Sequence, residues 1–367
     1  MNLYTYLQLD GNDVTVGTAY VNRRRGRLSS IFAFDAAYLA REEAYRFDPE
    51  LELALGTWPV SRGLPASFED SAPDRWGRNL IRKRLAGRSL DDLDYLLGVS
   101  DVTRQGALRF KTAVDEPFEH PDSRVPKLVA LPKLMEAAQS VELADKDAAD
   151  AVKYLLEAGS ASLGGARPKA AVTDGDSLYL AKFPHVHDSY DVIGEEYQAL
   201  CKAAALGLEV PEVRLVKISG ASVLLSKRFD RAAGGRRVGY MSALTLLGVR
   251  NGETRDYLDI AEAIPAISAD ATADLHELFS RIAFTILLNN TDDHLRNHGF
   301  LHGADGWRLS PMFDVNPDHD LAKSRTTTIG GSSTQDASIT ALLDNHAAFR
   351  LTRAEAESEF SRLASAF

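Results

Sequence analysis

Short apolar runs separated by turn residues open the chain, and this pattern is typical of β-strands. Residues 4–9 and 14–21 flank Asp10-Gly11-Asn12-Asp13, which is a strong hairpin signal. Residues 28–34 form a third apolar run. Between the second and third runs lies the densest basic segment, Arg23-Arg24-Arg25 with Arg27, which we interpret as a solvated strand end or turn.

Helical periodicity and further strand pairs follow. Pro73 is suited to a helix start, and residues 131–158, 193–206 and 274–288 have helical patterns, the second ending at Gly207. Residues 170–173 and 178–183 predict a hairpin around Asp174-Gly175-Asp176, and two more strands follow at 213–218 and 222–225. Prolines at 117, 121 and 126 mark a linker. We therefore expect three parts: an α/β module (1–125), a small lobe (126–230) and a mainly helical lobe (231–367).

Composition narrows the class of protein. The 367 residues are 45% hydrophobic and 26% charged, as in a folded soluble protein, and the net charge of -10 argues against a general grip on nucleic acid or anionic lipid. A single cysteine, Cys201, excludes an intrachain disulfide and a cysteine-rich zinc site. No secretory signal is visible, and the longest apolar stretch, 282–288, is too short for a membrane helix. We expect a cytoplasmic protein without a membrane partner.

The strongest chemical signal is Thr291-Asp292-Asp293-His294-Leu295-Arg296-Asn297. Asp314 follows it after a hairpin that is predicted around Gly303-Ala304-Asp305-Gly306. Kinase catalytic loops place an Asp and an Asn five positions apart. Such an Asp orients a hydroxyl and accepts its proton, while the Asn and a second Asp hold Mg²⁺. The spacing selects Asp292 as the base. We interpret Asp293 as a flanking solvated or metal-adjacent carboxylate.

Two upstream features fit the same chemistry. The loop Ser162-Leu163-Gly164-Gly165-Ala166 offers backbone N–H groups to phosphate oxygens, although a plain tight turn also explains it. Lys182 lies in an apolar strand, where it either points to solvent or meets an anion. Glu195 or Glu196 on the next helix is a candidate partner for Lys182, and we favour Glu196. The order of lysine strand, glutamate helix and two strands is the one by which kinases hold nucleotide phosphates.

Other site chemistries fit less well. A zinc hydrolase would need ligands among His185, His187, His294, His298 and His302, yet none has the His-Glu-x-x-His spacing. A serine hydrolase would need a Gly-x-Ser-x-Gly elbow, which the sequence lacks. The glycine loop is neither a Walker A loop nor a dinucleotide fingerprint.

Taken together, these motifs resemble the HipA-family serine/threonine kinases, toxins of bacterial toxin–antitoxin modules. The resemblance covers nearly the whole chain. The matching segments are residues 68–78, 162–169, Lys182, Lys227-Arg228-Phe229-Asp230-Arg231, residues 291–297 and Phe313-Asp314.

The resemblance implies roles for individual residues. Asp292 would be the base, Asn297 and Asp314 would hold Mg²⁺, and Ser162 would be autophosphorylated, which would switch the enzyme off by charge and bulk. The implied ATP-binding residues are Ser162, Gly164, Gly165, Ala166, Lys182, Glu196, the hinge Lys227, Arg228 and Phe229, and His294. A helix-turn-helix antitoxin like HipB would be the partner, and DNA contact would be mostly indirect through it.

We therefore expect an α+β, two-lobed protein-kinase-like fold with an N-terminal α/β module and a mainly helical C-terminal lobe. The expected activity is ATP- and Mg²⁺-dependent phosphorylation of a protein on serine or threonine, with a translation-related target such as an aminoacyl-tRNA synthetase implied by the resemblance alone. Two alternatives remain open. One is a kinase of a small molecule, and the other is a kinase-like binding module that acts only within a repressor complex.

Overall fold

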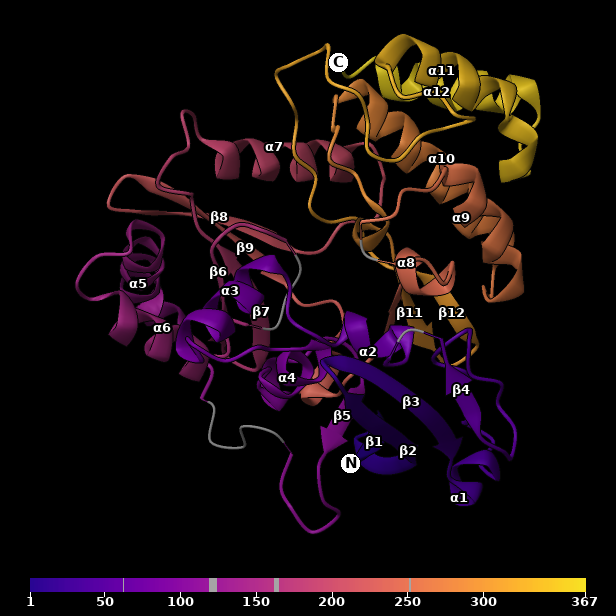
Figure 1. The fold of residues 1–367 in the computed structure, drawn as a ribbon. Helices are drawn as coiled ribbons and strands as arrows, with labels where there is room; N and C mark the ends of the chain where they lie inside the picture. The colour runs from indigo at the N-terminus through magenta and orange to yellow at the C-terminus, as the bar shows by residue number, and fades with distance from the viewer. Residues whose placement is uncertain (62, 119–123, 162–164, 251) are drawn as a thin grey trace. The chain divides into compact units, whose positions relative to one another are not determined.

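The computed structural model describes residues 1–367 except 62, 119–123, 162–164 and 251. The chain divides into two compact units (Figure 1). The first contains Met1–Ile193 and Arg214–Met241, and the second contains Gly194–Val213 and Ser242–Phe367. The three-part division at residues 125 and 230 stays a prediction.

A five-stranded sheet opens the first unit, with the strand order β4-β3-β2-β1-β5. The predicted hairpin turn is confirmed, because Leu9 pairs with Asn12 across Asp10 and Gly11. The strands are β1 (Asn2–Leu9), β2 (Asn12–Arg24), β3 (Arg27–Phe34), β4 (Trp58–Val60) and β5 (Leu108–Lys111). Short helices follow or connect them: α1 (Ala36–Leu39), α2 (Ala66–Asp70), α3 (Arg75–Arg84) and α4 (Asp92–Leu97).

Helix α3 begins two residues after the proline that suggested it. The carboxylate of Asp74 accepts a hydrogen bond from the backbone N–H of Gly77, so Asp74 is the N-cap and Pro73 precedes it. A side chain at Gly77 would collide with the backbone of Ala161, only 2.3 Å from the position of an added Cβ. Glycine is therefore required for α3 to pack against the segment that leads into the glycine loop.

The four-stranded sheet of the first unit has the order β6-β7-β9-β8. Its strands are β6 (Lys169–Asp174), β7 (Ser177–Lys182), β8 (Val213–Ile218) and β9 (Ala221–Lys227), as the sequence predicted within a few residues. Helices α3, α5 (Leu131–Leu143) and α6 (Ala148–Glu157) share one apolar core with this sheet. The single helical region expected at 131–158 is two helices, because Ala144 ends α5 in a left-handed conformation with φ 50°.

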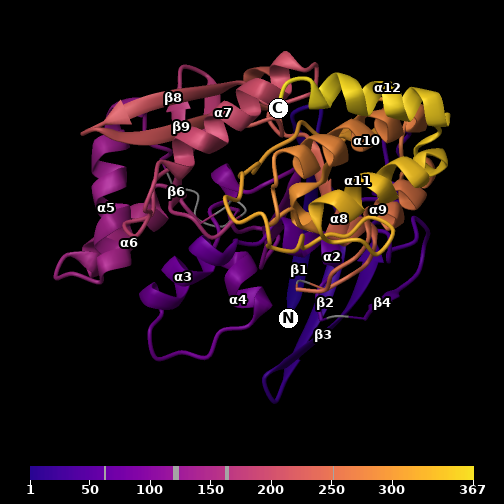
Figure 2. The same cartoon turned by 90° about the horizontal axis from the view of Figure 1, so that it is seen from above.

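The second unit is mainly helical, as predicted. Helix α10 lies at its centre and packs against α9, α11 and α12 (Figures 1 and 2). Its apolar side chains from Leu275 to Ile286 are almost fully buried, which confirms the helix expected at 274–288. The other elements are α7 (Val192–Ala205, whose first residues belong to the first unit), α8 (Ala243–Leu246), α9 (Tyr257–Ala263), α10 (Ala271–Leu287), β11 (Gly299–Gly303), β12 (Gly306–Leu309), α11 (Gln335–Asp344) and α12 (Arg353–Ala364). A short strand, β10 (Gly239–Ser242), lies where the chain passes from one unit to the other.

No helix in the described part of the chain is both long and apolar enough to cross a membrane.

Candidate functional site

The predicted catalytic loop follows directly from the C-terminal end of α10. Asn289 adopts a left-handed conformation with φ 56°, which turns the chain out of the helix. Its side-chain amide donates hydrogen bonds to the backbone oxygens of Asp318 (2.7 Å) and Asp320 (3.2 Å). The loop therefore starts from a buried helix and is held by a second segment, which limits its conformational freedom.

The two adjacent carboxylates of this loop have opposite environments. Asp292 is exposed, whereas Asp293 is only 4% exposed. The hydroxyl of Tyr257 donates a hydrogen bond to Asp293 Oδ2, and His298 Nε2 lies 3.1 Å from the same oxygen. The interpretation of Asp293 as a solvated carboxylate was wrong, because its side chain is buried and bonded within the core. The alternative, a metal-adjacent carboxylate, stays a prediction.

Charge and burial oppose each other at Asp293. Burial alone would raise the pKa of this carboxyl group, but His298, Tyr257 and Arg325 lower it below its ordinary value. Burial, with the nearby Asp293 carboxylate, raises the pKa of the Tyr257 hydroxyl, so Tyr257 remains a donor at neutral pH. The hydroxyl of Thr327 also donates to the backbone oxygen of Asp293. These bonds fix the backbone on one side of Asp292.

The predicted metal ligands lie on either side of the β11–β12 hairpin. Asn297 is 8% exposed, and its amide lies 3.4 Å from the backbone oxygen of Asp292. The hairpin brings Ser310 back to Gly299, to which its N–H donates at 2.8 Å. Asp314, four residues further on, has a left-handed backbone with φ 58°. Such a conformation is costly for a residue with a side chain, and it is found most often at functional sites.

Sequence reasoning missed a group of polar residues that supports the loop from outside. The hydroxyl of Thr291 donates to Asp318 Oδ2 at 2.8 Å, and Lys323 Nζ lies 2.6 Å from the same atom. The hydrogen bond from Lys323 is the main reason that the pKa of Asp318 falls to about 2. The same bond raises the pKa of Lys323, and the charge of Asp292 adds to it. Asp318 and Lys323 lie more than twenty positions after Asp292, and no local motif marks them.

His294 was predicted to contact the nucleotide. Its Nδ1 atom is buried and has no hydrogen-bond partner among the residues that the structure describes. A buried nitrogen without a partner is unfavourable in the free protein. Because this nitrogen is buried, its contact with a nucleotide stays a prediction.

In the first unit, Lys182 is the last residue of β7, an inner strand of its sheet, and is 6% exposed. It pairs in register with Lys169 of β6, so the two side chains lie on the same face of the sheet. Lys169 Nζ lies 2.5 Å from Asp74 Oδ2, and both side chains are buried. The sequence motif contained Lys169 without revealing its role, yet counting back from the turn at Gly175 would have paired the two lysines.

The other predicted nucleotide residues differ in how they are placed. Gly165 has φ 108° and accepts a hydrogen bond from the N–H of Trp76, and Ala166 is exposed. Ser162 and Gly164 lie outside the described residues. Lys227 and Phe229 are half-buried at the end of β9.

Arg228 was predicted to help form a nucleotide hinge, but its side chain is committed to the interior of the first unit. Its guanidinium group makes two hydrogen bonds to Asp230 and a third, at 3.0 Å, to the backbone oxygen of Thr103. Asp230 also accepts from Arg231 and from the N–H of Gly106. The charged side chains of this motif therefore connect the end of β9 to the segment before β5, and the place of Arg228 in a nucleotide hinge stays a prediction.

The two candidate glutamates on α7, Glu195 and Glu196, differ in how far their side chains are buried. Glu195 is partly exposed, and its Oε2 lies 2.8 Å from His319 Nε2. Glu196 is 1% exposed. Glu196 is therefore the inward-facing member, and its pairing with Lys182 stays a prediction.

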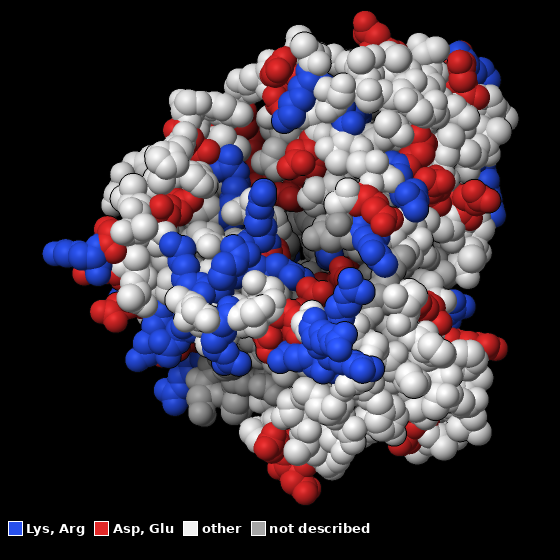
Figure 3. Space-filling view, viewed as in Figure 1, with Lys and Arg blue, Asp and Glu red and all other residues white. Residues whose placement is uncertain are grey.

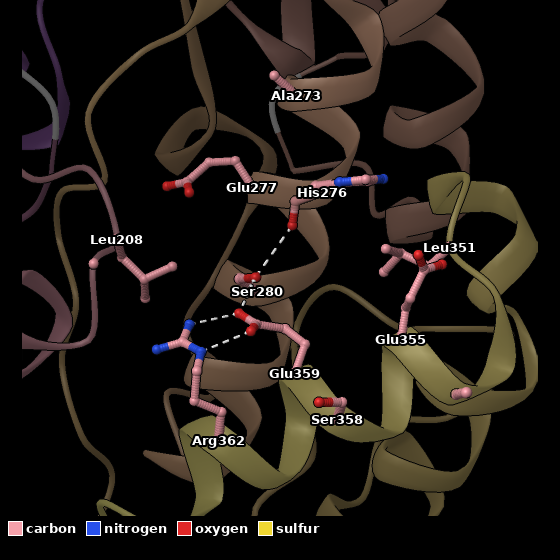
Figure 4. A pocket seen from close by; sticks show the side chains of 12 residues that line it. Leu208, Ala273, His276, Glu277, Ser280, Leu351, Glu355, Ser358, Glu359 and Arg362 are labelled. Atoms are coloured by element: carbon pink, nitrogen blue, oxygen red, sulfur yellow. Dashed lines mark hydrogen bonds and ion pairs between the residues drawn. The ribbon is translucent and has the colours of Figure 1, made fainter.

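A separate hollow of about 690 Å³ lies between α10, α12 and residues 207–208. Figure 4 shows that its central polar groups bind one another: Ser280 donates to Glu359 at 2.6 Å, and Arg362 donates to the same carboxylate at 2.7 Å. None of the predicted site residues lines it. We therefore assign it no part in the candidate site.

Metal ligands are sparse in the described residues. No group of three or more His, Cys, Asp and Glu side chains among them is placed to hold a metal ion. Mg²⁺ is commonly held by one or two protein oxygens together with substrate phosphates and water. The oxygens of Asn297 and Asp314 are of the kind that Mg²⁺ prefers.

Comparison with known proteins identifies the family. Residues 161–367 match the model of the HipA-like C-terminal domain, and residues 11–111 match that of the HipA N-terminal domain. The chain belongs to the HipA family. The predicted resemblance is thereby confirmed.

Individual relatives are more distant. A protein from Sinorhizobium fredii named "Putative kinase Y4mE" is 28% identical over 148 residues, which are 37% of this chain and 33% of that protein. A "Putative kinase" from Haemophilus influenzae is 28% identical over 143 residues, or 35% of this chain and 42% of that protein. The matched regions span less than half of either relative.

A solved structure matches nearly the whole chain. HipA of Shewanella oneidensis MR-1, in a complex with HipB and operator DNA, superimposes with a TM-score of 0.70 at 16% identity, covering 99% of this chain and 88% of that one. At this identity the likeness shows the fold alone. The predicted kinase-like α+β fold with two lobes is confirmed.

Proposed function

We propose that this protein is an ATP- and Mg²⁺-dependent serine/threonine protein kinase of the HipA type. The observation that carries the proposal is the contrast between Asp292 and Asp293. The exposed carboxylate is the one with kinase spacing to Asn297, and the buried one anchors the loop through Tyr257. A general base must reach its substrate, and the exposure of Asp292 supports it over the buried Asp293 in that role.

In the proposed reaction, Asp292 accepts a hydrogen bond from the hydroxyl group of the target and orients it. The hydroxyl oxygen forms a bond to the γ-phosphorus of ATP while the bond from that phosphorus to the β–γ bridging oxygen breaks, and ADP leaves. The hydroxyl proton passes to Asp292. Lys182 would bind the phosphates, and the orphaned Nδ1 of His294 would contact the nucleotide.

Mg²⁺, when bound by Asn297 and Asp314, would supply positive charge next to the phosphates. The backbone conformations of Asn297 and Asp314 support this proposed metal site. Asn297 lies in a short 3₁₀ turn, Leu295–Asn297, and Asp314 is held in a left-handed conformation.

We base the proposed regulation and partners of this protein on its membership of the HipA family. We propose Ser162 as the site of autophosphorylation, by which negative charge in the glycine loop would oppose the binding of ATP. In the matched Shewanella structure, HipA forms a complex with HipB and operator DNA. A HipB-like antitoxin is therefore the proposed partner, and a protein with an accessible serine or threonine is the proposed substrate.

The test uses the purified full chain, dephosphorylated first, with Mg²⁺ and γ-labelled ATP. We expect label on protein in the wild type, with Ser162 among the labelled sites by mass spectrometry. Asp292→Asn should lose about 100-fold or more of the rate, because a general base contributes about that much. Asp305→Asn is the matched control, since Asp305 is an exposed carboxylate in the β11–β12 turn.

Each alternative has its own signature. Label on a small acceptor but never on protein would indicate a small-molecule kinase. ATP binding without any phosphate transfer would indicate a binding module. Full activity in Asp292→Asn would refute the assigned base.

A further inference from the structure

The β2–β3 hairpin extends beyond its neighbours in the five-stranded sheet. Strand β1 starts opposite Tyr20, and β4 pairs with β3 only from Ser30 onward. The segment from residue 22 to residue 29 is therefore a ribbon of two strands. Its turn, Arg25-Gly26, has positive φ at both residues (51° and 75°), as in a tight two-residue hairpin turn (Figure 2).

This ribbon carries four arginines, which are all exposed: Arg23, Arg24, Arg25 and Arg27. Arg23 holds it in place. Its Nε lies 2.6 Å from Asp91 and its Nη2 lies 3.1 Å from Asp94, at the start of α4. The ribbon is thereby fixed beside the segment that follows α3.

Helix α3 presents a second set of basic side chains. Its apolar residues Trp76, Leu80 and Ile81 are buried in the core, so its charged residues face outward. The exposed ones on the helix and the following turn are Arg75, Arg82, Lys83, Arg84 and Arg88. In Figure 3, drawn in the view of Figure 1, Lys and Arg gather over α3 and the start of β3.

We define the basic face as the ribbon and helix arginines without ion-pair partners. Its members are Arg24, Arg25, Arg27, Arg75, Arg82, Arg84 and Arg88. Within the described residues, no carboxylate lies within ion-pair distance of any of these side chains. The chain as a whole has a net charge of -10. Arg75 and Arg82, seven positions apart, lie on one side of α3. Unpaired arginines on the ribbon and on this helix repel one another, and a polyanion would remove that repulsion.

We propose that the basic face binds the phosphate backbone of double-stranded DNA directly, with the β2–β3 ribbon in the major groove. This goes beyond the proposed kinase activity and does not depend on it. The guanidinium group of arginine binds phosphate oxygens in pairs, which suits it to a phosphate backbone. The major groove of B-form DNA is about 12 Å wide and admits a two-stranded ribbon.

Other anionic partners fit the basic face less well. No large hydrophobic side chain is exposed in residues 22–28 or 75–92, whereas Tyr20 and Ile31, which pair across the same hairpin, are 49% and 44% exposed. The arginine positions themselves therefore offer neither aromatic groups that stack on single-stranded bases nor apolar groups that enter a membrane. Duplex RNA has a deep, narrow major groove that would not admit the ribbon. An acidic protein is the remaining alternative, and the experiment includes it.

The test measures the fluorescence anisotropy of a labelled DNA duplex of scrambled sequence, about two helical turns long, with the full chain and without an antitoxin. We expect binding at about 50 mM salt that weakens on the order of 10³-fold by about 200 mM, because about six or seven phosphate contacts release condensed counterions and this release is less favourable at higher salt. Duplex RNA, single-stranded DNA and a polyglutamate competitor should each bind at least about 10-fold more weakly than the DNA duplex.

Two double variants locate the surface. Arg24→Glu with Arg27→Glu changes the ribbon, and Arg75→Glu with Arg82→Glu changes α3. Each should weaken binding at least about 30-fold and lower the salt dependence. Arg250→Glu with Arg255→Glu makes the same change in net charge at exposed positions of the second unit and should have little effect. All variants are first checked for an unchanged thermal midpoint.

The proposal fails if the duplex does not bind at about 50 mM salt, or if the control variant weakens binding as much as the other two. Equal or tighter binding of duplex RNA or polyglutamate would assign the basic face to that partner instead.

Discussion

Lys169 and Asp74 form an ion pair inside the first unit, with Nζ 2.5 Å from Oδ2 and the side chains 1% and 5% exposed. Lys169 also lies opposite Lys182 in the β6–β7 pair. Two lysines directly opposite each other are unfavourable when both are charged. Asp74 therefore compensates one of the two charges on the face of the sheet that carries Lys182.

We predict that Asp74→Ala lowers the free energy of unfolding by about 3–5 kcal/mol, because it leaves a buried ammonium group without a partner. Loss of the N-cap bond to Gly77 adds to this. Urea denaturation measures the effect. The control is Glu157→Ala, which breaks the exposed pair with Lys153 and should cost less than about 0.5 kcal/mol. The double variant Asp74→Leu with Lys169→Met should recover part of the lost free energy of unfolding. The prediction is contradicted if Asp74→Ala lowers the free energy of unfolding by less than about 1 kcal/mol.

The adjacent carboxylates of the loop should respond to substitution in opposite ways. We predict that Asp292→Asn lowers the rate of phosphate transfer by about 100-fold or more and leaves stability nearly unchanged, because this side chain is exposed. Asp293→Asn should lower stability by about 1–3 kcal/mol, because it weakens the buried bonds to Tyr257 and His298. Activity and thermal unfolding are measured on both variants. If Asp292→Asn proved to be the destabilised variant, the assignment of the two residues would be reversed.

A separate prediction follows from the left-handed backbone of Asp314. Glycine adopts φ 58° without strain, so Asp314→Gly should change the free energy of unfolding by no more than about 1 kcal/mol. The same change removes a proposed Mg²⁺ ligand, so activity should fall and require more Mg²⁺. Ala144→Gly is the control, because Ala144 has φ 50° at the end of α5, far along the chain from the loop. It should raise stability by up to about 1 kcal/mol with no change in activity. An Asp314→Gly variant with normal Mg²⁺ dependence would remove Asp314 from the metal site.

The elements of the fold were predictable wherever local sequence determines them. The turn at Asp10-Gly11, the β6–β7 hairpin and helix α10 all follow from periodicity and glycine placement. The spacing from Asp292 to Asn297 selected Asp292 as the base; the structure shows that this carboxylate is exposed, and its role stays a prediction.

What the sequence could not reveal depends on contacts between distant segments. Asp293 is buried because Tyr257, 36 positions earlier, reaches its carboxylate. Arg228 turns into the core because Thr103, 125 positions earlier, offers a backbone oxygen. Nothing in the residues next to Asp293 or Arg228 reports these partners. The sequence therefore allowed a solvated Asp293, which the tertiary structure overturned, and it could not show that the Arg228 side chain is buried.

The final prediction concerns the pH dependence of stability at Asp230. Burial alone would raise the pKa of this carboxyl group, but Arg228 and Arg231 lower it well below its ordinary value. An unfolded Asp binds a proton near about pH 4, whereas the folded one does so only at lower pH. The stabilisation from Asp230 is therefore complete above about pH 4 and is lost as the pH falls further.

We predict that Asp230→Asn lowers the thermal midpoint at about pH 7 and that its difference from the wild type shrinks between about pH 4 and about pH 2.5. Asp48 provides a control of opposite sign, because burial raises its pKa despite hydrogen bonds from the N–H groups of Ser67 and Glu50. For a group with a raised pKa, the folded state binds the proton more tightly. The wild type should therefore gain stability relative to Asp48→Asn as the pH falls toward about 4. Thermal midpoints of the wild type and both variants, measured across this pH range, test the two opposite pH dependences. If the midpoints of the wild type and Asp230→Asn changed in parallel with pH, Asp230 would not be held in its charged form by its arginines.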